Sequence, residues 1–140
     1  MQIRHKHQDT SYKQIPNSKN SNSKQGKRTF DLEERTTEFA KMIVRLCKKL
    51  PRNPINNRPI DQVIGSSGSV GANYREANDA LGKADFLNKL RIARREAKEA
   101  IHWLEVLKEA NESFADEIDE CEKEATELKN ILSSIIIKAS

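Results

Sequence analysis

Aromatic residues make up only 5% of this 140-residue sequence, whereas charged residues make up 33%. A core must then come mainly from leucine, isoleucine and alanine, a composition that suits a helical protein. No run of 18 apolar residues occurs, so we expect no membrane-spanning helix. The polar N-terminus lacks the apolar segment of a secretory signal peptide, which favours a cytoplasmic location. Only two cysteines occur, Cys47 and Cys121, and we expect both to be reduced residues of a helical core.

Motifs that carry catalytic chemistry are also missing. The patterns HExxH and GxSxG do not occur, and neither does a P-loop. His102 stands beside Trp103 with no nucleophile or metal ligand at a telling spacing. His5 and His7 lack further ligands nearby. The sequence therefore predicts a protein that is not an enzyme and that holds no metal and no cofactor.

The net charge of +4 is unevenly distributed along the chain. Residues 1–29 contain seven Lys or Arg and a single acid, Asp9, whereas residues 30–140 contain 18 basic and 20 acidic residues. The first segment has few large apolar side chains, so we expect a disordered basic tail with a charge of +6. Such a tail attracts the phosphates of RNA or DNA. The alternative is a solvated leader without a partner.

Apolar residues at spacings of three and four predict four helical segments. These segments span residues 31–50, 59–78, 84–110 and 114–137. Asp31 and Glu34 stand in capping-box spacing at the start of the first segment. Pro51 and Pro54 stop it, and Pro59 is placed to open the second after a polar loop. Short connections predict an all-α, antiparallel up-down-up-down four-helix bundle over residues 30–140.

The expected second helix contains three glycines at a spacing of three: Gly65, Gly68 and Gly71. Glycine costs roughly 1 kcal/mol relative to alanine inside a helix. We therefore expect a neighbouring helix to approach closely there; a phosphate-binding loop is the alternative, although GSSGSVG lacks the P-loop pattern. The expected buried face of this helix comprises Ile60, Val63, Ile64, Ser67, Gly71, Tyr74 and Leu81.

A consecutive polar set follows the glycines: Asn73, Tyr74, Arg75 and Glu76. Polar residues in a bundle often hydrogen-bond across helices and so fix the register of packing. We expect this structural role for the polar set. A ligand contact, in the bundle or in the pore of a ring of subunits, is the alternative.

The expected third helix carries three stripes of side chains, taken at about 100° per residue. The core stripe comprises Phe86, Leu90, Ala93, Ala97, Ile101, Leu104 and Leu107. The basic stripe beside it comprises Arg91, Arg94, Arg95 and Lys98. The apolar stripe, far from the core stripe, comprises Ile92, Trp103 and Val106.

The basic stripe and the apolar stripe each have more than one interpretation. Three interpretations of the basic stripe stay open. It forms a solvated face with a local Arg95–Glu99 pair, it contacts nucleic acid, or it contacts an acidic surface. Residues 109–127 supply such an acidic surface, with nine acids and one base, Lys123. A single bundle would leave the apolar stripe exposed, so we predict self-association through it unless the tail or a loop covers it.

Several segments of the chain match a known family. The most specific is SVGANYREA at residues 69–77, followed eight residues on by Asp85 and Phe86. Further matches are Leu50-Pro51, Gln62-Val63-Ile64, KLRIA at 89–93, Glu96-Ala97, Glu99 and Trp103-Leu104. Through these residues the chain, over about 30–137, resembles the four-helix-bundle proteins encoded in intervening sequences of bacterial 23S rRNA genes. Gly65 and Gly68 depart from the serine or longer aliphatic residue that is usual in the family.

This resemblance implies a bacterial, cytoplasmic, left-handed bundle that forms homo-oligomers, in particular a pentameric ring, and a genetic setting that suggests association with RNA or the ribosome. A structurally similar protein, the accessory variability determinant of diversity-generating retroelements, is a basic pentamer that binds reverse transcriptase and nucleic acid. Our leading hypothesis is an oligomer that binds RNA or other nucleic acid through the tail and the basic stripe. The alternative is a scaffold whose ring docks a partner enzyme without binding nucleic acid.

Overall fold

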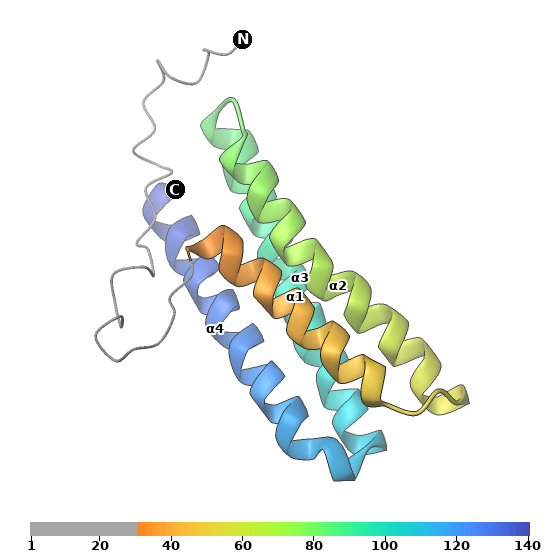
Figure 1. Ribbon diagram of the computed structural model, residues 1–140. Coiled ribbons are helices and arrows are strands. Elements are labelled where there is room, and N and C mark those ends of the chain that lie inside the picture. The colour runs from red at the N-terminus through yellow and green to blue at the C-terminus, as the bar shows by residue number, and fades with distance from the viewer. Residues whose placement is uncertain (1–30) are drawn as a thin grey trace.

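The computed structural model describes residues 31–140 and contains four long helices. They are α1 (Leu32–Lys49), α2 (Pro54–Asn78), α3 (Lys83–Ala110) and α4 (Ala115–Ala139), and the short 3₁₀ helix η5 (Glu112–Phe114) precedes α4. Consecutive long helices run in opposite directions, and the α2–α3 hairpin extends past the first turn of α1 (Figure 1). This arrangement confirms the predicted all-α four-helix fold. The predicted basic tail, residues 1–29, lies outside the described residues.

The helix boundaries follow the predicted ones closely in three cases. At the start of α1, Asp31 Oδ1 accepts from the Glu34 backbone N–H at 2.8 Å, and Glu34 Oε1 accepts from the Asp31 N–H at 3.4 Å. The capping box is therefore confirmed. The helices α3 and α4 each begin within one residue of the expected position. None of the described helices is long and apolar enough to cross a membrane.

The start of α2 differs from the prediction, because the helix begins at Pro54 rather than at Pro59. Asn53 caps it, since its side chain accepts a hydrogen bond from the Asn56 backbone N–H at 2.8 Å. Pro54 occupies the first turn, where a missing N–H removes no helical bond. Pro59 lies inside the helix, so the predicted polar loop over 51–58 is wrong beyond its first three residues.

All four long helices contribute to one hydrophobic core. Its largest fully buried side chains are Phe39, Ile43, Leu46, Ile60, Phe86, Leu90, Leu104, Leu107, Ile118, Leu128, Leu132 and Ile135. Cys47 and Cys121 are buried in this core as free cysteines, as the sequence predicts. Burial raises the pKa of Cys47 to about 11 and that of Cys121 to about 12, so both thiols stay protonated at neutral pH.

The buried face of α2 is wider than predicted, because α2 packs against both α1 and α3. Ser66, Val70 and Ala77 are buried in addition to the expected residues. Two expected core residues are exposed instead. Leu81 is 62% exposed because α2 ends at Asn78 and leaves it in the turn, and Ile64 is 40% exposed because it lies outside the arc that contacts the neighbouring helices.

The three glycines of α2 play different roles. A Cβ atom at Gly71 would lie 2.9 Å from Thr36 Oγ1, so here α1 approaches α2 closely. A Cβ at Gly65 or at Gly68 would meet no described atom within 4 Å. The expectation that a neighbouring helix needs the space is thus right for Gly71 and wrong for the other two within this single chain.

A buried pair of asparagines joins two connections at one end of the bundle. Asn56 Nδ2 donates to Asn111 Oδ1 at 2.9 Å, and Asn111 Nδ2 donates to Asn56 Oδ1 at 3.0 Å. Asn56 also donates to the Pro51 carbonyl at 2.8 Å, and Asn111 to the Leu107 carbonyl at 2.9 Å. The pair therefore ties the α1–α2 connection to the α3–α4 connection. The pair was not predicted from the sequence.

Candidate nucleic-acid interface

The basic stripe lies on the outer side of α3 beside α4. Arg91, Arg95 and Lys98 are exposed and form no hydrogen bond or ion pair with another described residue. Arg94 is half-buried, and its Nη1 donates to Ser133 Oγ of α4 at 3.4 Å. The stripe thus offers three exposed cations that have no hydrogen-bond or ion-pair partner among the described residues.

The local pair expected between Arg95 and Glu99 is not formed. Glu99 Oε2 instead accepts a hydrogen bond from Trp103 Nε1 at 3.3 Å. Glu96, between them, is partly buried, and this burial, followed by the Glu99 charge, raises its pKa, whereas Arg95 acts to lower it. The Arg95 charge therefore acts on the pKa of Glu96, although the Arg95 side chain remains exposed to solvent.

The second half of α4 extends the basic stripe. The Arg94–Ser133 contact sets the register of two antiparallel helices, which places Lys98 level with Lys129, one turn before Ser133. Residues 128–140 contain Lys129 and Lys138 and no acid. We define the basic surface as Arg91, Arg94, Arg95, Lys98 and Lys129. The sequence signal for Lys129 is the absence of acids at the end of α4. This signal assigns Lys129 to the basic surface only when the register of α4 against α3 is known.

The opposite half of the same α3–α4 face is acidic and hollowed. A groove of about 430 Å³ is lined by Ile101, Glu105, Asp119, Glu122, Lys123, Thr126 and Glu127, and we call it the acidic groove. Lys108 Nζ bridges two of its acids, at 2.7 Å from Asp119 and 3.1 Å from Glu122. One face of the molecule thus carries a basic half and an acidic half in line.

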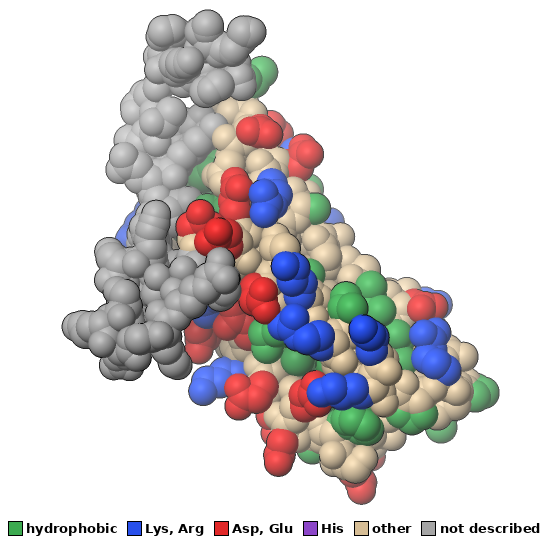
Figure 2. All heavy atoms as spheres, in the orientation of Figure 1, with side chains coloured by type: hydrophobic (Ala, Val, Ile, Leu, Met, Phe, Trp, Pro, Cys, Tyr) green, Lys and Arg blue, Asp and Glu red, His purple; other side chains and the backbone are tan. Residues whose placement is uncertain are grey.

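A further group of cations lies on another face and was not singled out from the sequence. Figure 2 shows Lys and Arg side chains gathered along α1 and the connection to α2. The exposed cations of this region are Lys41, Arg45, Lys48, Lys49, Arg52 and Arg58. Arg45 pairs with Glu38 at 2.7 Å and Lys49 with Glu117 at 3.0 Å, so part of the charge is neutralised locally.

The apolar stripe is only partly exposed in one chain. Trp103 is half-buried and packs against the core, with its ring in an edge contact with His102 at 4.8 Å between centroids. Ile92 is half-buried, and Val106 is 36% exposed. The stripe remains a candidate contact between subunits, although it offers less free apolar surface than the sequence pattern suggests.

Two members of the polar set point inward or along their own helix. Asn73 Nδ2 donates to the Ser69 carbonyl at 2.9 Å, within α2. Tyr74 is buried, and burial raises its pKa to about 12. Neither side chain lines the basic surface or the acidic groove.

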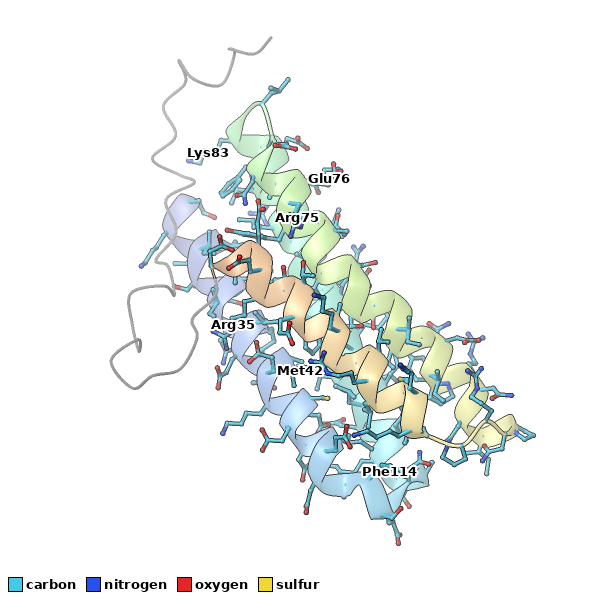
Figure 3. All side chains as sticks on the ribbon, in the orientation of Figure 1. Arg35, Met42, Arg75, Glu76, Lys83 and Phe114 are labelled. Carbon is cyan, nitrogen blue, oxygen red and sulfur yellow. The ribbon has the colours of Figure 1, made fainter. Side chains whose placement is uncertain are left out.

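The other two members connect α2 to its neighbours. Arg75 Nη1 donates to Glu33 Oε1 at 3.0 Å and its Nη2 to Thr37 Oγ1 at 3.1 Å, both on α1. Figure 3 shows Arg75 beside the start of α1. Glu76 faces Lys89 of α3 at the longer distance of 4.0 Å. The described residues include no group of three or more His, Cys, Asp or Glu side chains that could hold a metal ion.

Comparison with known proteins places the chain in a family. The family model of the 23S rRNA-intervening sequence protein matches residues 28–134. A similar crystal structure is that of a protein of unknown function from the S23 ribosomal protein family of Bacteroides thetaiotaomicron VPI-5482, at 37% identity and a TM-score of 0.65 over 74% of this chain and 96% of that one. No curated protein matches. The chain therefore belongs to the 23S rRNA-intervening sequence protein family.

Proposed function

We propose that this protein is a non-enzymatic oligomer that binds RNA or another nucleic acid through the basic surface. The observation that carries the proposal is a set of three exposed cations, Arg91, Arg95 and Lys98, beside the acid-free end of α4. Within residues 31–140 none of the three has an ion-pair partner. Exposed cations without local partners can neutralise phosphates and release their counterions, which drives binding without sequence preference. The family description, which refers to 23S rRNA intervening sequences, supports RNA as the first ligand to test.

We expect binding of a generic single-stranded RNA to weaken steeply as salt rises. With about four phosphates neutralised, affinity should fall roughly 50-fold between 50 and 200 mM salt. Replacing Arg91 and Arg95 by alanine should weaken binding of all RNA sequences about equally. It should also reduce the slope of log affinity against log salt concentration by the contribution of nearly two phosphate contacts. Fluorescence anisotropy with a labelled RNA measures both quantities.

The matched control for this experiment lies on α1. Lys41→Ala with Lys48→Ala removes the same charge from the other basic face, where both side chains are exposed. The proposal requires that this control keep most of the affinity. Equal losses in the two double variants would show non-specific attraction to the whole protein, and absence of binding at 50 mM salt would rule out the nucleic-acid function.

The oligomeric part of the proposal is self-association through Ile92, Trp103 and Val106, in the pentameric ring that the family resemblance implies. Light scattering should give a mass that is a defined multiple of the 16.0 kDa chain. Val106→Glu puts a charge at the exposed edge of the stripe and should reduce that mass without unfolding the bundle. A monomer in the unaltered protein would contradict self-association.

The alternative function is a scaffold whose ring docks a partner enzyme. The alternation of a basic half and an acidic half on one face favours it, because the basic surface of one chain could pair with the acidic groove of a neighbour. Reversing charge with Arg91→Glu and Arg95→Glu should then break the oligomer. If the basic surface serves nucleic acid instead, the same variant keeps its mass and loses RNA binding.

A further inference from the structure

Two of the large aliphatic side chains that a single chain leaves exposed lie on the outer edge between α1 and α2. Val44 of α1 is 45% exposed and Ile64 of α2 is 40% exposed. At this edge Thr37 Oγ1 accepts a hydrogen bond from Arg75 Nη2 at 3.1 Å. Val44 follows Thr37 by two helical turns and so lies on the same side of α1. Ile64 precedes Arg75 by three turns and so lies on the same side of α2.

These two aliphatic side chains are also level with each other. The helices α1 and α2 run in opposite directions, and Gly71 of α2 lies against Thr36 of α1. Val44 lies eight residues along α1 from this contact, and Ile64 lies seven residues back along α2. Each is therefore about 11 Å from the contact in the same direction, which places the two side chains side by side on neighbouring helices.

The surface around this aliphatic pair is basic. Lys41 and Lys48 stand one turn before and one turn after Val44, and both are exposed and form no ion pair with another described residue. The exposed acid on this part of α2, Asp61, lies 3.9 Å from Arg52. Figure 2 shows hydrophobic side chains among the Lys and Arg side chains of this region. We define the α1–α2 face as Lys41, Val44, Lys48 and Ile64.

The apolar stripe of α3 is acidic at its exposed end. Val106 is 36% exposed, and its neighbours Glu105 and Glu109 are exposed and form no ion pair with a described residue. Glu99, two turns earlier, also lacks an ion pair within residues 31–140. Between residues 99 and 110 the only Lys or Arg is Lys108, which pairs with two acids of α4. This end of the stripe thus combines an exposed valine with negative charge.

We propose that the exposed end of the apolar stripe in one copy of this chain contacts the α1–α2 face of a second copy. The inference rests on the proposed self-association and names the surface that the stripe meets. In this pairing the exposed aliphatic side chains of the two copies bury each other, while the lysines of α1 face the acids of α3. Pairing of like surfaces would instead set lysine against lysine, or acid against acid, and would be repulsive.

The two surfaces cannot meet within one chain. Each of α1 and α3 packs against α2 and α4, so α1 and α3 occupy diagonal positions in the bundle. Contact between the two surfaces therefore joins different copies head to tail and leaves one surface of each kind free at the ends. Such a contact repeats until the chain of subunits closes into a ring or continues as a filament.

Mixing two variants, each altered on one surface, tests this arrangement by light scattering. Val44→Glu disables the α1–α2 face and Val106→Glu disables the stripe, so each variant alone should be a monomer of 16.0 kDa. In an equal mixture, the intact stripe of the first variant meets the intact α1–α2 face of the second. The mixture should therefore form a dimer of twice that mass and nothing larger.

Ile137→Glu is the matched control, because Ile137 is a 73% exposed aliphatic residue near the end of α4 and outside both surfaces. This control should keep the mass of the unaltered protein, and circular dichroism should show the same helix content in all three variants. If Val44→Glu keeps the full mass while Val106→Glu loses it, the stripe pairs with something other than the α1–α2 face, and the proposal is overturned. A mixture that stays monomeric would overturn it as well.

Reversal of charge gives a second test that leaves the aliphatic residues intact. Lys41→Glu with Lys48→Glu should dissociate the oligomer, and adding Glu105→Lys with Glu109→Lys to the same chain should restore its mass. Alanine at the two lysines removes only weak surface ion pairs and should keep the oligomer, so reversal is the informative change. Failure of the second pair to restore the mass would contradict the pairing. A monomeric unaltered protein would contradict the self-association itself, a result distinct from either failure above.

Discussion

Replacing Asn56 by leucine is expected to lower the free energy of unfolding by about 3 kcal/mol, the cost of leaving buried polar groups unpaired. Asn56 is 1% exposed and Asn111 is 7% exposed. The leucine would have a similar size but would leave the Asn111 amide without its partner and the Pro51 carbonyl without its donor. The Asn111 amide cannot replace this partner with bulk water, because its side chain is buried. Asn111→Leu should cost a similar amount for the reciprocal reason.

Denaturant unfolding followed by circular dichroism measures these changes, at one fixed protein concentration because association would shift the midpoint. The double variant Asn56→Leu with Asn111→Leu removes both partners and should be less destabilised than the sum of the single variants. Asn57→Leu is the matched control: Asn57 is the next residue, exposed, and accepts only from Arg52 Nε at 3.1 Å. A strictly additive double variant, or a control as damaging as Asn56→Leu, would contradict a paired amide at this position.

The asparagine pair also shows why part of this fold could not be predicted. Fifty-five residues separate Asn56 from Asn111 in the chain, and nothing in the local pattern connects them. The predicted elements rest on a different kind of information, the spacing of apolar residues within one helix. That spacing identified α1, α3 and α4 to within one or two residues and identified most of the core. Contacts between helices depend on register, which apolar spacing leaves open.

The start of α2 was missed for a more local reason. Both Pro54 and Pro59 fit the rule that proline is favoured in the first turn of a helix. What distinguishes them is Asn53, whose side chain accepts a hydrogen bond from the Asn56 N–H and so caps a helix that begins at Pro54. An Asn-Pro pair can supply a cap residue followed by a first-turn proline. On this rule the start of α2 would have been predicted correctly.

The candidate interface likewise has one part that was predictable from the sequence and another that depends on how the helices pack. The four cations of the basic stripe followed from helical periodicity alone, and all four lie on one side of α3. Lys129 joined them only once the Arg94–Ser133 contact had fixed how α4 lies along α3. The same register brings Glu105 of α3 to the acids of α4 and creates the acidic groove. The charges on each helix were predictable from the sequence, whereas the packing of the helices determines which charges share a surface.

Gly71→Ala is expected to destabilise the bundle by about 2 kcal/mol, although alanine is the better helix former. The new Cβ would lie 2.9 Å from Thr36 Oγ1, 3.3 Å from Thr36 Cβ and 3.6 Å from the Thr36 carbonyl carbon. Thr36 is fully buried, and its hydroxyl donates to the Glu33 carbonyl at 3.0 Å. Its branched side chain is stiff, so rotating the hydroxyl away would present the methyl group to the same space. Relief requires α1 and α2 to separate.

The same substitution at Gly68 should have the opposite sign, because a Cβ there meets nothing within 4 Å and the helix gains roughly 1 kcal/mol in propensity. Denaturant unfolding of the two alanine variants thus compares one chemical change in two environments on one helix. Adding Thr36→Ala to Gly71→Ala should recover part of the loss, which isolates the contact by a double-mutant cycle. Stabilisation by Gly71→Ala would mean that α1 and α2 are further apart in solution. Destabilisation by Gly68→Ala would mean that this open face is occupied, and the first occupant to consider would be a second copy of the chain.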